Sequence, residues 1–120
     1  MGDISKDFSR HEHACYCGCG FDTVDAELNR VLQKDIRDHY GKRVTITGPN
    51  RCHKQNSQTP GASDHSAHQV GKAADFKVEG VTPVHVYAHL DAKYQNKYGL
   101  GLYHNRVHVD VRPKRARWKV

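Results

Sequence analysis

Two short runs of the sequence carry the side chains best suited to chemistry. The first, residues 66–75, places His68 and Asp75 seven positions apart across a spacer rich in glycine and alanine. The second places His108 and Asp110 two positions apart. Imidazole and carboxylate groups suit zinc, and a catalytic zinc typically takes three protein ligands and keeps one position for water. The spacing therefore predicts a zinc centre with His68, Asp75 and His108 as its ligands.

Such a centre favours amide hydrolysis, because bound zinc lowers the pKa of its water towards neutrality and polarises a carbonyl. A general base must then take the proton of that water. Asp110 is one candidate, since it shares a strand face with His108, although its carboxylate can instead accept a hydrogen bond from a histidine N–H. His104 is the other candidate, and both stay open on the sequence alone.

Arg51 and Ser66 are the candidate substrate-binding residues. Arg51 follows a predicted strand directly and opens a long polar loop, residues 52–67. Its guanidinium can bind a substrate carboxylate in bidentate fashion or steady an oxyanion, and the alternative is an ordinary surface arginine. Ser66 can hydrogen-bond the loop or the substrate. A loop this long in a small domain is more often functional than idle.

Four cysteines leave several states open: Cys15, Cys17, Cys19 and Cys52. The C-x-C-x-C spacing of the first three differs from the C-x2-C pair of common zinc fingers. The four can be reduced thiols, two disulfides or ligands of a structural metal. The ten histidines favour metal chemistry without locating it, and most of them are expected at the surface.

The elements that must position the candidate ligands are predicted from apolar periodicity. Helical spacing indicates an amphipathic helix over residues 23–40, capped by Asp22 or Thr23 and stopped by Gly41. A second helix begins with Thr82 as N-cap and Pro83 at the first position, and runs to about Lys97. β-branched and alternating patterns predict the strands, which cover residues 43–47, 73–78, 100–104 and 107–111.

The alternation within two of these strands places the chemistry on one side. Ala74 and Phe76 share a face, so that Asp75 points the other way. His108 and Asp110 likewise share the face opposite their valine neighbours. The two strands can thus present polar groups to the same side of one sheet.

Composition limits the class of protein. A chain of 120 residues with 37% hydrophobic residues predicts one domain, residues 1–120, with a modest core. No apolar run is long enough to span a membrane, and the N-terminus lacks a signal-peptide core. The net charge of +6 favours an anionic partner such as nucleic acid, a membrane surface or a cell-wall polymer. Much of that charge lies in residues 112–119, for which a solvated terminal face is the alternative.

The motif residues resemble a known family. Ser66-x-His68-x-x-Gly71-x-Ala73-x-Asp75 is similar to the S-x-H-x-x-G-x-A-x-D pattern of the zinc D-alanyl-D-alanine peptidases. The resemblance extends over most of the chain, through the Cys-Gly-Cys-Gly-Phe segment at 17–21, the strand before Arg51, and the ending at 107–112 and 116–118. Many small members of that family are bacterial or phage cell-wall hydrolases.

The resemblance implies a Hedgehog/DD-peptidase-like α+β fold, with helices packed on a small antiparallel sheet. It implies His68, Asp75 and His108 as zinc ligands, Arg51 as the substrate-binding arginine, and Ser66 as the motif serine. The substrate it implies is the peptide part of peptidoglycan, cleaved at D-Ala-D-Ala or L-Ala-D-Glu bonds.

The chain also departs from the family pattern. Several relatives carry an acidic base three residues before the last ligand, where this chain has Asn105. A catalytically inactive cell-wall-binding module of the same fold is therefore the competing hypothesis. We expect a monomer without nucleic-acid partners. With no leader recognised, we expect it to act at the cell wall after release from the host cytoplasm by a phage, or as a virion-associated enzyme.

Overall fold

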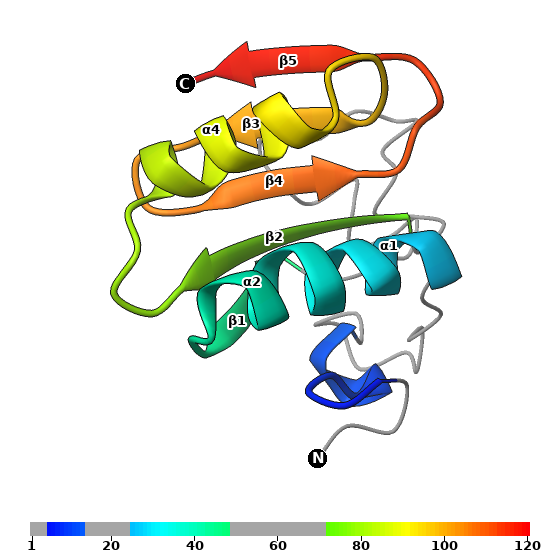
Figure 1. The fold of residues 1–120 in the computed structure, drawn as a ribbon, viewed down its shortest axis with the longest axis vertical. Coiled ribbons are helices and arrows are strands. Elements are labelled where there is room, and N and C mark those ends of the chain that lie inside the picture. The colour runs from blue at the N-terminus through cyan, green and yellow to red at the C-terminus, as the bar shows by residue number, and fades with distance from the viewer. Residues whose placement is uncertain (1–4, 14–24, 49–71) are drawn as a thin grey trace, which may run out of the picture.

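The computed structural model describes residues 5–13, 25–48 and 72–120. Within these ranges one five-stranded sheet organises the chain, with the strand order β1-β2-β4-β3-β5 (Figure 1). The first four strands pair antiparallel with their neighbours, and β5 pairs parallel with β3. Their bounds are Val44–Gly48 for β1, Ala73–Val78 for β2, Gly99–Leu102 for β3, Val107–Asp110 for β4 and Ala116–Lys119 for β5.

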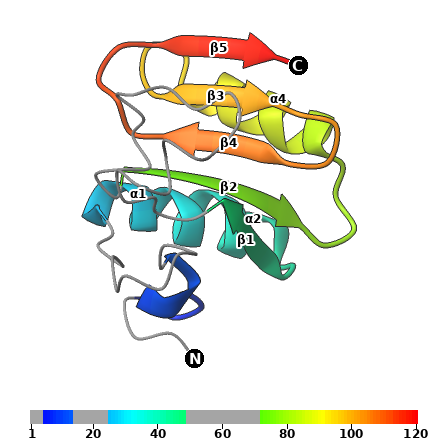
Figure 2. The ribbon, with the colours of Figure 1, turned by 180° about the vertical axis from the view of Figure 1, so that it is seen from behind.

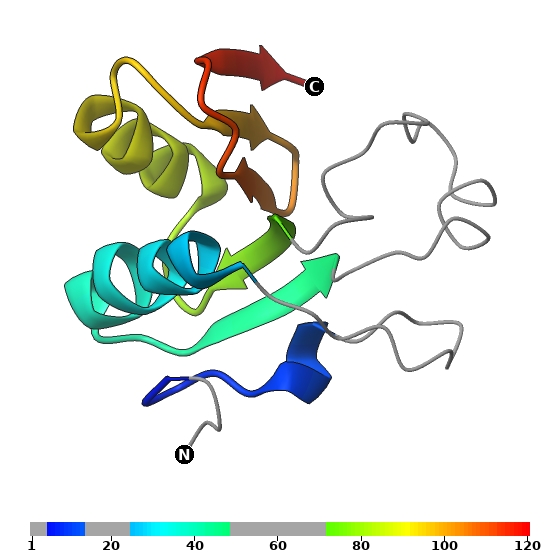
Figure 3. The ribbon, with the colours of Figure 1, turned by 90° about the vertical axis from the view of Figure 1, so that its right-hand side faces the viewer.

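Two helical segments cover one face of this sheet (Figure 3). The first is continuous along the chain but changes its winding, from α1 (Ala26–Arg30) through the π-helical η2 (Val31–Arg37) to α2 (Asp38–Tyr40). The second is α4 (Pro83–Lys93). Seen from behind, the strands lie in front of both helices (Figure 2), so the opposite face of the sheet carries neither of them. A short 3-10 helix, η1 (Arg10–His13), precedes them.

The helix ends follow from capping chemistry. Thr82 caps α4 and Pro83 stands at its first position, as predicted. Gly41 ends the first helix in the left-handed conformation with φ 63°, which glycine adopts without steric cost. The N-cap of α1 is Asp25 and not Asp22 or Thr23, because its carboxylate accepts from the backbone N–H groups of the next turn. α4 ends at Lys93, earlier than predicted.

The core lies between the helices and the sheet. Phe8, from the N-terminal segment, is buried with it. Its other fully buried members come from the first helix, from α4 and from the inner face of the strands, and include Leu28, Leu32, Ile36, Val86, Leu90, Phe76, Leu100, Val107 and Val109. This burial explains the alternation, since every second residue of β2, β3 and β4 points to the helices.

The α+β class is confirmed, but the expectation of a wholly antiparallel sheet is wrong. For residues 112–119 the sequence left open a surface for an anionic partner or a solvated terminal face and predicted no strand, whereas part of this run forms β5 and hydrogen-bonds along β3. The sequence did not predict this edge strand because the run is highly charged and lacks alternating apolar residues. None of the described helices has the length and apolar character needed to cross a membrane.

Candidate metal centre

One row of residues crosses the sheet on the face away from the helices. The strand registers place Gly48 opposite Asp75, Asp75 opposite His108, His108 opposite Gly101, and Gly101 opposite Trp118. All five strands thus contribute one residue to the row. Because neighbouring strands lie about 4.8 Å apart, side chains in such a row are direct neighbours.

His108 is held between two carboxylates. Its Nδ1 lies 2.8 Å from Oδ1 of Asp75, and its Nε2 lies 2.8 Å from Oδ2 of Asp110. The imidazole side chain is only 11% exposed, and Asp110 is fully buried. The alternation predicted for the two strands therefore does bring these three side chains together.

Asp110 is fixed from its other side by Arg112. The guanidinium donates from Nε to Oδ1 at 2.7 Å and from Nη2 to Oδ2 at 2.8 Å, and the backbone N–H of Arg112 donates to Oδ1 at 3.2 Å. Bidentate pairs of this kind combine charge with fixed geometry. The carboxylate of Asp110 therefore has one orientation.

Three glycines make room for these side chains. A Cβ on Gly48 would lie 2.5 Å from Oδ2 of Asp75, and one on Gly99 would lie 2.3 Å from Oδ2 of Asp110. A Cβ on Gly101 would lie 2.4 Å from Nε1 of Trp118. Real Cβ atoms do not approach other atoms so closely, so a larger residue at any of these three positions displaces the side chain it meets.

The electrostatics follow from the same contacts. Burial lowers the pKa of His108, but the hydrogen bonds and charges of Asp110 and Asp75 outweigh burial and raise it above the ordinary value. Burial raises the pKa of Asp110, yet the hydrogen bonds from His108 and Arg112 outweigh burial and hold the pKa well below its ordinary range. Asp110 is therefore an anion throughout the physiological pH range.

An aromatic pair, Trp118 and Tyr103, lies at the β5 end of the row. Trp118 packs against His108 with ring centroids 5.0 Å apart, and its Nε1 donates to the Tyr103 hydroxyl at 3.0 Å. The guanidinium of Arg106 lies over the Tyr103 ring at 4.1 Å. Its Nε is also 3.8 Å from Oδ2 of Asp75. The sequence did not predict this group of Trp118, Tyr103 and Arg106, because only the parallel pairing of β5 with β3 brings Trp118 next to His108.

The remaining predicted residues lie elsewhere. His104 is exposed in the turn between β3 and β4, and among the described candidates it contacts none of Asp75, His108 and Asp110. His68, Arg51 and Ser66 lie outside the described residues, as do all four cysteines. Within residues 5–13, 25–48 and 72–120, no three His, Cys, Asp or Glu side chains are grouped to hold a metal ion.

The donors that are described fit two positions of a zinc site. Asp75 offers a carboxylate oxygen and His108 a ring nitrogen, and the two atoms face each other at 2.8 Å. Asp110 can accept a hydrogen bond from Nε2–H, and with the proton on that nitrogen the lone pair of Nδ1, which faces Asp75, would be the one to bind a metal ion. A histidine supported by a carboxylate in this way is a common zinc-ligand arrangement.

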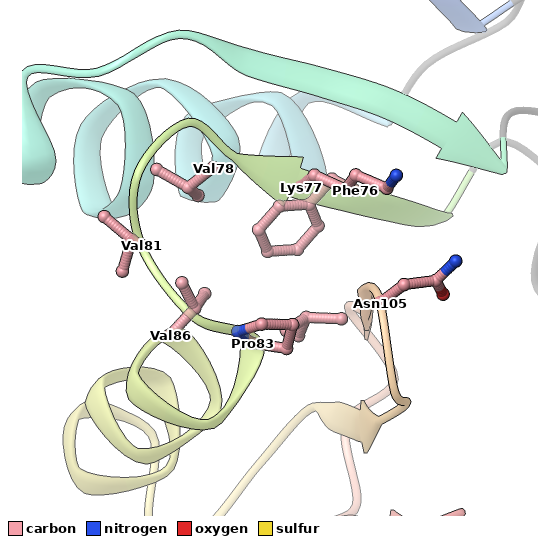
Figure 4. A pocket seen from close by; sticks show the side chains of 8 residues that line it. Phe76, Lys77, Val78, Val81, Pro83, Val86 and Asn105 are labelled. Atoms are coloured by element: carbon pink, nitrogen blue, oxygen red, sulfur yellow. The ribbon is translucent and has the colours of Figure 1, made fainter.

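A separate cavity of about 130 Å³ lies on the other face of the sheet (Figure 4). Its lining is mainly apolar and includes Phe76, Val78 and Val107, which face the helices, with Asn105 at the β3–β4 turn. Residues of β2 and β4 thus line the cavity on one face and the polar row on the other. None of the residues lining it is among the candidate ligands.

The structure thus combines an α+β fold with a row of polar side chains on the face of the sheet away from the helices. Residues 6–110 match the family model described as Peptidase M15, so the chain belongs to that family of peptidases. This confirms the resemblance to the zinc D-alanyl-D-alanine carboxypeptidases. Comparisons with curated proteins and with solved structures returned no match.

Proposed function

We propose that the protein hydrolyses peptide bonds in the stem peptide of peptidoglycan, as a zinc-dependent D-Ala-D-Ala carboxypeptidase or L-Ala-D-Glu endopeptidase. The observation that supports this most is His108, which contacts Asp75 through one ring nitrogen and Asp110 through the other. Membership of the peptidase family supports the reaction class. We also infer a Hedgehog/DD-peptidase type of fold.

The zinc ligands in this proposal are His68, Asp75 and His108. When bound, zinc would supply an activated water and polarise the scissile carbonyl. The chain's own part is orientation: Asp110 keeps the imidazole of His108 in one tautomer, and Arg112 holds Asp110 in place. Arg51 and Ser66 are proposed to bind the substrate.

The geometry favours Asp110 as a positioning residue over Asp110 as the general base. Its two oxygens already accept from His108 and Arg112, and it lies at Nε2, while Asp75 lies at Nδ1. His104 stays the other candidate base. Replacing Asp110 by Asn should weaken zinc binding by about 10- to 100-fold, which is the usual effect of losing such a partner. Unchanged zinc affinity with abolished turnover would instead favour a role as base.

Defined muropeptides provide the direct test. The wild-type protein with zinc should release new amines, and mass spectrometry of the products should show which bond is cleaved. His68→Ala and His108→Ala should abolish both zinc binding and release. His11→Ala is the matched control, since His11 is exposed in η1. Full activity of either ligand variant would overturn the proposal.

An inactive cell-wall-binding module is the second candidate function. It is favoured by Asn105, an exposed neutral residue where several relatives carry an acid, and by the engagement of both oxygens of Asp110. Such a module predicts retention on purified cell walls with no amine released on prolonged incubation. Any zinc-dependent product in the muropeptide assay excludes it.

A further inference from the structure

Arg106 is a cation beside Asp75 on the site face, and its guanidinium still has capacity for a ligand. Arg112 donates twice to the buried Asp110, so its charge is already matched. Arg106 donates to the neutral side chain of Asn105 at 3.2 Å, and its only carboxylate neighbour among the described residues is Asp75 at 3.8 Å. Within the described part of the chain, its Nη2 makes no hydrogen bond.

The guanidinium of Arg106 is also held in place before any ligand arrives. It lies over the Tyr103 ring at 4.1 Å, and the Tyr103 N–H donates to the Arg106 carbonyl at 3.1 Å to close the turn. The Tyr103 hydroxyl in turn accepts from Trp118. A stacked guanidinium loses little side-chain entropy when it binds an anion. Its side chain is still 37% exposed, so a ligand can reach it.

Its position is next to the proposed centre. Nε of Arg106 is 3.8 Å from Oδ2 of Asp75, whose Oδ1 is 2.8 Å from His108. An anion bound at Arg106 would therefore lie beside Asp75, at the edge of the proposed centre. The planar fork of a guanidinium matches a carboxylate better than any neutral group of similar size.

We propose that Arg106 is a specificity-determining residue that binds a free carboxylate of the substrate peptide beside the cleaved bond. This rests on the proposed peptidase function. The carboxylate comes either from the C-terminus of the peptide or from an acidic residue within it. The proposal adds a cation from the β3–β4 turn to the Arg51 expected from the sequence.

Three synthetic stem peptides distinguish a C-terminal carboxylate from the carboxylate of an internal acidic residue as the group that Arg106 binds. One has both carboxylates free, one has the C-terminal carboxylate amidated, and one has the internal acidic residue amidated. Trp118 is the only tryptophan of the chain and lies one hydrogen bond from Tyr103, so its fluorescence reports binding without turnover. One of the two amidations should weaken binding by about 10-fold or more, the usual loss for a hydrogen bond to a charged group.

Arg106→Gln should weaken binding of the free-acid peptide by a similar factor. It should leave unchanged the binding of the amidated peptide that the wild-type protein binds more weakly. In kinetics the loss should appear in KM, with kcat changed by less than about threefold. Arg106→Lys keeps the charge without the planar fork, so its affinity for the free-acid peptide should lie between those of the wild type and Arg106→Gln. Lys114→Gln, the loss of an exposed cation, is the control for net charge.

Equal binding of all three peptides by the wild-type protein would overturn the proposal without any variant. So would an Arg106→Gln effect of the same size on acid and amide peptides. If no peptide is hydrolysed but the fluorescence still discriminates acid from amide, the peptidase function fails while the carboxylate site stands. The two failures are therefore distinguishable.

Discussion

His13 shows how strongly one residue can depend on its surroundings. It ends η1 with no exposed surface, and neither ring nitrogen has a hydrogen-bond partner within the described residues. Burial alone lowers its pKa from 6.5 to about 4. Burial therefore favours the neutral imidazole of His13 over the charged one.

His13 should make the protein sensitive to mild acid. Its pKa is lower in the folded than in the unfolded state, so its contribution is fully present above pH 6.5 and is lost as pH falls towards 4. The loss reaches about 3 kcal/mol if the whole shift is realised. Urea unfolding followed by circular dichroism at pH 7, 5.5 and 4.5 measures it.

His13→Phe should flatten this pH dependence, because phenylalanine fills the site without titrating. Stability at pH 7 should be equal or higher, since two buried nitrogens without a hydrogen-bond partner among the described residues are removed. His11→Gln, at an exposed histidine of the same short helix, should leave the slope unchanged. A His13→Phe protein with the wild-type slope would show that the acid sensitivity arises elsewhere.

For single residues, the sequence predicts part of the candidate site. The alternation of β2 and β4 places Asp75, His108 and Asp110 on one face, and the structure confirms it by direct contacts. The pairing of Arg112 with Asp110 and the packing of Trp118 on His108 were not predicted. The packing of Trp118 depends on the pairing of β5 with β3, which no local pattern encodes, whereas Arg112 and Asp110 are only two residues apart.

Among the elements, the first helix departs most from its expected geometry. The apolar residues recur at helical spacing, but η2 is wound as a π-helix, and Gln33 and Asp35 within it are buried. Gln33 donates to Asp7 at 2.8 Å, and Asp35 accepts from the Tyr94 hydroxyl. These partners lie far away in sequence, so an apolar stripe predicts the helix without predicting its buried polar side.

In β3, Gly101 leaves space for the indole ring of Trp118. Gly101→Ala should push the Trp118 indole out of place and cost about 1–3 kcal/mol of stability, because its Cβ would lie 2.4 Å from Nε1. The emission of Trp118 should also shift as the ring loses its contact with His108. Chemical denaturation and fluorescence spectra measure the two effects.

A double-mutant cycle isolates the steric cause. In a Trp118→Leu background the smaller side chain leaves space for the new Cβ, so Gly101→Ala should cost less there. The difference between the two costs is the coupling energy of the pair. A cost that is the same in both backgrounds would show that Gly101 matters for backbone reasons alone.

For the whole molecule, the basic C-terminal run turns out to be partly structural. Arg112 holds Asp110, and Arg117 donates to Asp91 of α4 and to the carbonyl of Tyr98. These charges are matched inside the protein, which weakens the case for a nucleic-acid surface made from the net charge alone. The family match ends at residue 110, yet β5 completes the sheet beyond it.

Arg117 ties β5 to α4 and to the start of β3, so its removal should affect the whole fold. Its Nε donates to Asp91 at 2.6 Å and its Nη1 to the Tyr98 carbonyl at 2.7 Å, with only 8% of the side chain exposed. Arg117→Gln should lower the free energy of unfolding by about 2–3 kcal/mol, because a buried charge-assisted network is lost. Arg115 is the matched control, since it pairs with the same Asp91 at 3.5 Å but is 51% exposed. Arg115→Gln should cost less than about 1 kcal/mol, as exposed pairs do. Equal losses for the two variants in urea unfolding would mean that the charge of Asp91, and not the buried contacts of Arg117, anchors the last strand.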